Sequence, residues 1–509
     1  MAKRVVTVAA SALLLGGCTV GSNFHAPRWA SPASWFAGEP RKAQGERSEP
    51  VSAPLDLEWW SVFRDPRLTR LERQVAASNL NVQAAAFRVL ESRAQLGITR
   101  AGLVPNINAN GSYERSKPSN RGIFSLLQGG ADAGTQGTEA NGAFGNAASG
   151  IKNPPNLPAF DIFQYGLGAS WEPDFFGRVR RSIESGEATL NAAEWAQRAA
   201  LVAALAEVAR DYITLRGTQE QLRIARDNVR TAQQGLNLTR QRAAAGVTTD
   251  LDVANASAQL ETTAAQIPML EAQERQLVNA LSLLVALPPN ALLAELSDPR
   301  PVPPVPRRVP VGFPSELARR RPDIREAEAQ LHAATANVGV AVANFYPSIT
   351  LNASFGFQAI SQPFKVLTGD ARQYSFGPGI SVPIFQGGQL RQTLVLRKAE
   401  AREAAITYQR TVLAAWHDVA NALIAFRDEQ RRRDQLMRAV AQNRRALSLA
   451  QSRYSVGVAG FLEVLDAERN LLATEQQLAT STANVSSDLV SLYLALGGGW
   501  QLFEPQAGG

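Results

Sequence analysis

A near-duplicated stretch divides the sequence into two similar halves. Residues 453–466 read RYSVGVAGFLEVLD, and residues 242–253 read RAAAGVTTDLDV, with Arg, Gly-Val and Asp in the same order. In each copy a Gly-Val turn joins two long segments of helical period, and two segments of alternating polarity come before it. We therefore predict a two-fold internal repeat, in which each half is a helix, a hairpin, a long helix, a turn and a returning helix.

The long helices exclude a compact domain. Residues 178–242 have helical period and no proline, so at 1.5 Å per residue they would form a rod on the order of 100 Å. Further helices are predicted at residues 66–100, 250–285, 315–344 and 461–496, and between Gly388 and Tyr454. Pro268 should kink the second of these. The first repeat is thus placed at residues 66–286, a Pro-rich linker at 287–314, the second repeat at 315–496 and a tail at 497–509.

Four segments alternate between apolar and polar residues, as half-buried strands do. They lie near residues 105–113, 163–171, 349–357 and 374–384, with a Gly-rich loop predicted at 115–160. Each has about the length that a tilted strand needs to cross a bilayer. Four strands cannot close a barrel, and open edges are not tolerated in lipid. The strands are therefore either in water or shared by several chains in one barrel. Two chains would give eight strands, the smallest bacterial barrel, whose interior is filled by side chains, and three chains would give twelve strands, which could leave a channel.

The N-terminal residues are typical of an exported lipoprotein. Residues 1–17 have a basic start and an apolar run, which predicts a cleaved signal peptide. Cys18 is the only cysteine, and Leu15-Gly16-Gly17-Cys18 resembles a bacterial lipobox. We therefore predict that Cys18 carries lipid, including a palmitate chain. The next residue, Thr19, favours the outer membrane as the destination. One lipid group anchors only with help from other membrane contacts. Residues 18–65 are predicted to be an extended segment packed down by Trp59, Trp60 and Phe63.

Enzyme and nucleic-acid functions find little support. The net charge of +7 is spread along helices without a dense basic block, which disfavours nucleic acid as a partner. The three histidines have no metal-ligand spacing to cysteine or carboxylate pairs. Gly497-Gly498-Gly499 neither follows a strand nor opens a helix, so it is no phosphate cradle. We expect no catalytic residues, no metal and no cofactor.

Several motifs together resemble the TolC-like outer membrane factors, in the lipoprotein branch paired with resistance-nodulation-division pumps (the NodT family). They are Cys18-Thr19-Val20-Gly21, residues 59–68 (WWSVFRDPRL), residues 320–325 (RRPDIR), residues 345–349 (FYPSI), the two Gly-Val turns and residues 496–500 (LGGGW). The resemblance implies an α+β membrane protein: a homotrimer with a twelve-stranded outer-membrane β-barrel and a periplasmic coiled-coil tunnel closed at its tip. It also implies docking on a periplasmic adaptor (membrane fusion protein) and an inner-membrane resistance-nodulation-division transporter. The implied function is passive export of small toxic compounds.

The resemblance assigns a gate to the second repeat. Leu462 and Asp466 would form rings at the aperture, with Arg469 one turn beyond. Positions i, i+4 and i+7 share one helix face, and three Asp466 carboxylates would repel one another and attract cations. An ordinary helix start, with an acidic residue near the positive end, is the alternative. The first repeat has Leu251, Asn255 and Ala258 at the matching positions, which suggests that only one helix pair moves.

Two further sets of residues follow from the resemblance. Asp252 and Tyr454 would link the repeats in the closed state, although a tyrosine between helices is more often packing. Gly246 and Gly457 are predicted to supply the positive φ of tight turns. The tips that would dock on the adaptor are made of Gly246, Val247, Thr248, Ser455, Gly457, Val458 and Ala459.

Two other functions remain open from the residues. A duct for type I protein secretion has a similar fold. A trimeric surface lipoprotein that acts only as a scaffold belongs to a different class, but it would not need four bilayer-length strands. The sequence names neither the exported substrate nor the resting state of the channel.

Overall fold

The computed structural model describes residues 19–27, 32, 34–35, 47–117, 159–360 and 367–503. The predicted signal peptide, Cys18, most of the loop at 115–160 and the last six residues of the tail lie outside them. The described residues form two units. One, the sheet unit, is made of residues 19–21, Gly97–Ile183 and Val338–Val395, and the other, the helical unit, contains the rest of the chain.

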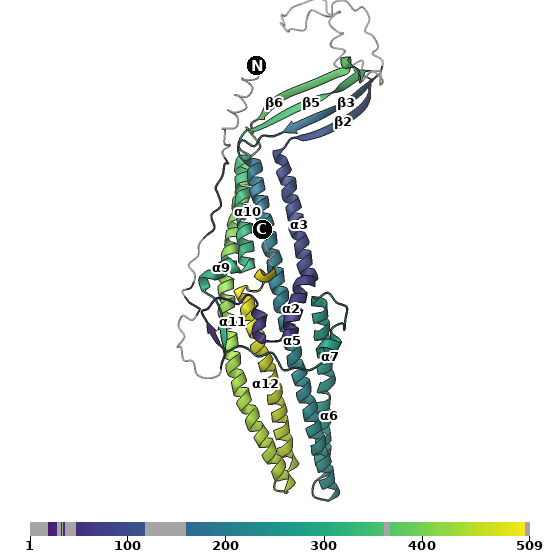
Figure 1. Ribbon diagram of the computed structural model, residues 1–509, viewed down its shortest axis with the longest axis vertical. Coiled ribbons are helices and arrows are strands. Elements are labelled where there is room, and N and C mark those ends of the chain that lie inside the picture. Colours follow the sequence, from purple (N-terminus) through teal and green to yellow (C-terminus); the bar gives the residue numbers. More distant parts are fainter. Residues whose placement is uncertain are drawn as a thin grey trace, which may run out of the picture. The chain divides into compact units, whose positions relative to one another are not determined.

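The sheet unit contains a four-stranded antiparallel sheet in the order β2-β3-β5-β6 (Figure 1). Its strands are β2 (Asn106–Ser116), β3 (Phe160–Trp171), β5 (Ser348–Ile360) and β6 (Arg372–Ser381). These are the four strands predicted from alternation, except that the last one ends early. Its partner strand β5 begins at Ser348, which stands opposite Ser381, so the pairing stops there.

The register gives the sheet one apolar and one polar face. Ala109, Leu167, Phe355 and Tyr374 stand opposite one another across the four strands and therefore point to the same side. Large side chains on this face are exposed. They include Ile107, Tyr113, Leu167, Phe355, Tyr374, Phe376 and Ile380. The opposite face carries Asn, Gln, Ser and Gly, among them Asn108, Asn110, Gln164, Ser354 and Ser375.

The helical unit is organised around antiparallel helix pairs. Helix α5 (Arg178–Ala244) lies along α6 (Asp250–Ala264) and α7 (Gln266–Leu284), and α11 (Gln389–Ser455) lies along α12 (Phe461–Leu496), as Figure 1 shows. The remaining helices are α2 (Pro66–Ser78), α3 (Leu80–Arg100), α8 (Leu293–Leu296), α9 (Leu317–Arg320) and α10 (Pro322–Ala343). None of the helices in the described part of the chain is long and apolar enough to cross a membrane.

The largest core packs the N-terminal segment against the helices, as predicted. Trp59, Trp60 and Phe63 are buried, Trp59 stacks on Tyr493 with ring centroids 5.5 Å apart, and Trp60 stacks on Phe503. Aromatic side chains bury large apolar areas. Their burial in one cluster fixes a segment whose described residues include only a three-residue strand and one short 3-10 helix as regular structure.

Three predicted elements differ in the structure. The helix predicted at 66–100 is broken at the buried Asn79, whose side chain accepts from the N–H groups of Asn81 and Val82 and donates to the carbonyl of Leu284. It thus caps α3 instead of continuing α2. The helix predicted at 315–344 is interrupted before Pro322, because a residue that precedes proline avoids the helical region. The helix predicted at 250–285 is interrupted at Ala265, between α6 and α7, three residues before the Pro268 at which a kink was expected.

The Pro-rich linker is not structureless either. Its residues include α8 and strand β4 (Arg308–Pro310), which pairs in parallel with β1 (Glu49–Val51). Two three-residue strands from distant parts of the chain therefore tie the N-terminal segment to the linker.

Candidate functional site

The two helical tips end in the same backbone motif. After α5, Gly246 N–H donates to Ala243 and Val247 N–H to the carbonyl of Arg242, and Gly246 has φ of 73°. After α11 the same two bonds run from Gly457 and Val458, and Gly457 has φ of 82°. This is the Schellman ending, whose left-handed residue is most easily glycine. Both glycines therefore have the structural role predicted for them.

The returning helices begin differently. Thr249 caps α6 in a capping box with Asp252, whose carboxylate also accepts from the hydroxyl of Thr248 at 2.5 Å. The Thr248 hydrogen bond lowers the pKa of Asp252. Helix α12 begins after Gly460, which has no side chain to cap it. A side-chain cap is worth about 1 kcal/mol, so the second repeat starts its returning helix with less local support.

Arg242 joins the two tips. Its guanidinium donates to the carbonyls of Tyr454 at 2.8 Å and Ser455 at 3.0 Å, and lies 4.7 Å from the centroid of the Tyr454 ring. A cation at the C-terminal end of α11 is favourable because free carbonyls carry partial negative charge there. One feature of the sequence points to Arg242, because it is the first residue of the duplicated stretch.

The predicted link between Asp252 and Tyr454 is not formed in this conformation. The hydroxyl of Tyr454 is buried without a hydrogen-bond partner among the described residues, and its ring packs on Phe461. Asp252 is engaged in its capping box. The repeats are joined by Arg242 instead, and a closed-state link between Asp252 and Tyr454 stays a prediction.

The residues predicted as a gate lie on one exposed face of α12. Leu462 is 61% exposed, and Asp466 and Arg469 are exposed as well, while Val464 and Leu465 are buried on the other side. Arg469 has an additional role that the sequence did not suggest. Its Nε donates to Gln259 on α6 at 2.8 Å, which is another of the hydrogen bonds between the repeats.

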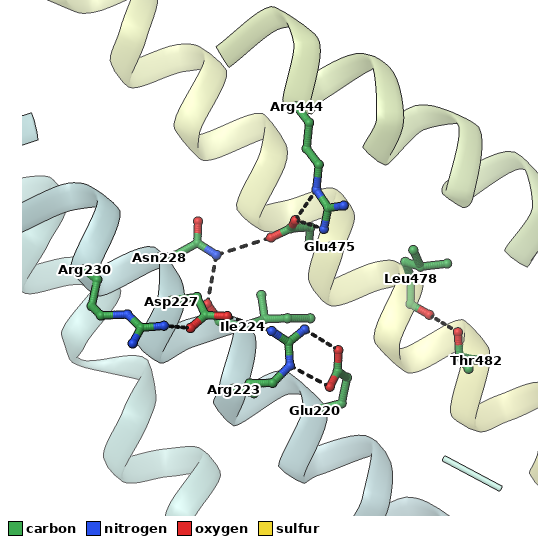
Figure 2. A network of polar contacts seen from close by, with 10 residues as sticks. All are labelled: Glu220, Arg223, Ile224, Asp227, Asn228, Arg230, Arg444, Glu475, Leu478 and Thr482. Carbon is green, nitrogen blue, oxygen red and sulfur yellow. Dashed lines mark hydrogen bonds and ion pairs between the residues drawn. The ribbon is translucent and has the colours of Figure 1, made fainter. Parts of the chain in front are cut away.

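Farther from the tips, a polar network connects α5, α11 and α12 (Figure 2). Glu475 of α12 accepts from Arg444 of α11 at 2.7 Å and from Asn228 of α5 at 3.4 Å. On α5, Arg223 pairs with Glu220 and Asp227. Arg223 and Arg444 are exposed and their partners are partly exposed, so each of these ion pairs contributes little to stability.

A second constellation holds the first residues after Cys18. The buried Arg181 donates to the carbonyls of Val20 at 3.1 Å and Gly21 at 3.2 Å. A Cβ on Gly21 would come 2.7 Å from the Cα of Gly339, and one on Gly177 would come 2.9 Å from Thr19. Residues 19–21 are thus fixed within the sheet unit by an arginine and two close contacts at glycines.

We predict that Arg242→Met loosens the end of α11. Loss of two hydrogen bonds from a charged donor is worth roughly 1.5–3 kcal/mol each, so amide exchange at residues 454–458 should become at least about tenfold faster. Arg453→Met is the matched control, because the one contact of the Arg453 guanidinium with the described residues is an exposed ion pair with Glu463. If amide exchange at residues 454–458 became equally faster in Arg242→Met and in Arg453→Met, Arg242 would not be the residue that joins the two tips.

Within the described residues, no three His, Cys, Asp or Glu side chains lie close enough to hold a metal ion. The residues at the two tips and those around Arg181 form helix ends, caps and packing contacts. Such contacts hold a conformation of the chain.

Comparisons with known proteins agree with this arrangement. A family model described as outer membrane efflux protein matches residues 71–287 and 313–498. The antibiotic efflux pump outer membrane protein ArpC of Pseudomonas putida is 31% identical over 503 residues, which cover 98% of this chain and 96% of that protein. Nodulation protein T of Rhizobium leguminosarum bv. viciae is 31% identical over 488 residues, which cover 96% of this chain and 92% of that protein.

Among solved structures, the outer-membrane channel OprN superimposes with a TM-score of 0.82 and 32% sequence identity. The match covers 95% of this chain and 100% of that chain. The expected α+β channel fold is thereby confirmed, as is the family that the motifs suggested. The chain belongs to the outer membrane efflux protein family.

Proposed function

We propose that three copies of this chain form the outer-membrane duct of a tripartite efflux pump, through which small toxic compounds leave the cell passively. The observation that carries the proposal is the two-faced sheet with unpaired edges. Strands β2 and β6 are the outer strands of the sheet order and run in opposite directions. The β6 edge of one copy can therefore continue the sheet of the next copy at β2 in antiparallel fashion.

Closure requires more than one copy, because backbone groups at an open edge cannot stay unpaired in lipid. Eight strands would enclose a barrel filled with side chains, whereas twelve can leave a channel. The exposed apolar face would meet lipid, and the face of Asn, Gln, Ser and Gly would line water. A scaffold protein that transports nothing would not need a sheet with one face for lipid and one face for water.

The lipid anchor belongs to the same proposal. Thr19, the residue after Cys18, packs against Gly177, and Arg181 holds the two residues that follow. A lipid on Cys18 would therefore start from the sheet unit, which supports a membrane contact beside the barrel.

At the two helical tips, we propose the gate and the docking surface. Leu462, Asp466 and Arg469 of three copies would form the aperture. Val247, Thr248, Ser455, Val458 and Ala459 would contact a periplasmic adaptor, which in turn joins a resistance-nodulation-division transporter that supplies the energy. Support comes from the apolar side chains exposed at both tips, namely Val247, Val456 and Val458. The efflux relatives favour this assembly over a duct for polypeptides, and a family of channels gives no reason to expect catalysis.

The barrel can be tested with paired cysteines on the two edge strands. Residues 108, 110 and 112 of β2 are each combined with residues 373, 375 or 377 of β6, all on the polar face. At least one pair should give a ladder of disulfide-linked species that ends at the trimer on a denaturing gel. Variants with only one of the two cysteines are the controls. A ladder that ends at the dimer, or no linked species from any pair, would contradict the trimer.

A further inference from the structure

The two repeats match helix for helix, and the match gives each residue of one repeat an equivalent in the other. Helices α5 and α11 each have 67 residues and begin 211 positions apart, and each directly follows a glycine of positive φ, Gly177 or Gly388. Helices α3 and α10 begin 242 positions apart, and the prolines before the strands that follow them, Pro105 and Pro347, have the same separation. These two separations identify the equivalent residues.

Inside one copy, the two repeats are joined where α5 packs on α10. Arg181 of α5 is 3% exposed, and a Cβ on Gly339 of α10 would come 2.9 Å from Cδ of Arg181. Three residues farther along α5, Oε1 of Glu184 lies 3.0 Å from Nε2 of His332. These two contacts fix how α5 and α10 are placed along one another.

The equivalent positions on α11 and α3 are uncovered in a single copy. The first contact has Gln392 and Gly97 as its equivalents. Both are exposed, and a Cβ on Gly97 would have no atom from another part of the described chain within 4 Å. The second contact has Val395 and Leu90, which are 56% and 52% exposed. Large apolar side chains left in water at matched positions of two helices indicate a partner that covers both.

The sheet indicates which partner this is. Helix α5 follows β3 and helix α10 precedes β5, and these two strands are paired inside one copy. Helix α11 follows β6 and helix α3 precedes β2, which are the two outer strands of the sheet. The start of α11 and the end of α3 therefore belong to opposite edges of one copy. They can meet only where β6 of one copy adjoins β2 of the next.

We propose that α11 of one copy packs on α3 of the next copy in the register in which α5 packs on α10. Gln392 would lie against Gly97 of the next copy, where the absence of a side chain leaves room for it. Val395 would pack on Leu90 of the next copy, and both side chains would leave water. The proposal rests on the proposed association of copies, and it adds the contact surface and its register.

The same separations predict how the strands pair between copies. Ser170 and Asn352 stand opposite each other on β3 and β5. Their equivalents, Ser381 of β6 and Asn110 on β2 of the next copy, would therefore stand opposite each other. The separations also carry the apolar face of β3 and β5 onto the apolar face of β6 and β2. An error of one residue in either separation would have exchanged the two faces.

The register can be tested with paired cysteines in the full-length protein, oxidised in detergent. Gln392→Cys with Gly97→Cys should give a ladder of disulfide-linked species that ends at the trimer, because the equivalent residues inside one copy are in contact. The matched controls are Gln392→Cys with Leu90→Cys, and Ala399→Cys with Gly97→Cys. Each control moves one cysteine seven residues along the same helix face, about 10 Å, and should give no ladder. Variants with one added cysteine control for Cys18.

The outcomes separate this inference from the proposed function. A ladder from a shifted pair in place of the matched pair would overturn the register. If the matched pair fails while the edge-strand pairs of the barrel link, the copies associate but another partner covers the helices, so the inference falls and the duct stands. If neither set links, the association of copies fails and the inference falls with it.

Opposite charges give a second readout that does not depend on disulfide geometry. Val395→Asp or Leu90→Lys alone should lower the temperature at which the trimer separates in detergent by several degrees, because a charge would be buried without a partner. The double variant should regain most of this loss, since the two charges would meet between copies. Leu251→Asp, at an exposed leucine on the tip of α6, should behave as wild type. A double variant no better than the single variants, or single variants that separate as wild type does, would contradict the contact.

Discussion

Replacing Leu462 and Asp466 together by alanine is expected to raise the conductance of the reconstituted channel in planar bilayers by about tenfold or more. Three leucines would form an apolar constriction that gates by excluding water, and three carboxylates beside it would bind passing cations. Both side chains lie on the exposed face of α12. Their removal should therefore cost the fold little.

The first repeat provides the matched control. Leu251 and Asn255 occupy the equivalent positions on α6, and Leu251 is exposed like Leu462. Leu251→Ala with Asn255→Ala should leave conductance close to wild type. Equal increases from both pairs would mean that the aperture is not made by the second repeat, and no increase from either would remove the proposed gate.

The second large effect concerns the pH dependence of stability. Glu72 of α2 is 0% exposed, and neither oxygen of its carboxyl group has a partner among the described residues. Burial raises the pKa of Glu72 well above its ordinary value. The folded state therefore keeps this proton at pH values where the unfolded chain, with a glutamate pKa of about 4.3, has released it. Folding stability falls as pH rises across that interval.

Glu72→Gln should flatten this dependence, because an amide does not titrate. Between pH 5 and pH 8 the melting temperature of wild type should fall several degrees more than that of Glu72→Gln, since each kcal/mol corresponds to roughly 2–4 °C in a large domain. Glu91→Gln, at an exposed position of α3, should follow wild type. Parallel curves for wild type and Glu72→Gln would show that the Glu72 carboxyl is ionised in the folded protein.

The elements that the sequence predicted well are those with a local signature. The four strands were visible because strict alternation over about ten residues is typical of a half-buried strand and does not fit the period of a helix. Helix α12 begins at Phe461 and ends at Leu496 as predicted, because Gly460 and Gly497 mark its two ends. The glycines of the two tips were recognised for the same reason.

The features that the sequence missed depend on partners far away in the chain. Asn79 ends α2 partly because its amide reaches the carbonyl of Leu284. Strands β1 and β4 are three residues long and exist only through each other. Arg242 opens the duplicated stretch, but its role depends on Tyr454, which lies 212 positions away in the chain.

Crosslinking in cells from the tips tests the central claim most directly. A photoreactive amino acid at position 455 or 459 is activated in cells, and the captured proteins are identified by mass spectrometry. As a pump duct, the protein should capture a periplasmic adaptor together with its resistance-nodulation-division transporter, and the same probe at the exposed position 91, away from the tips, should not. Capture of an ABC-type secretion complex, or of neither, would contradict the account.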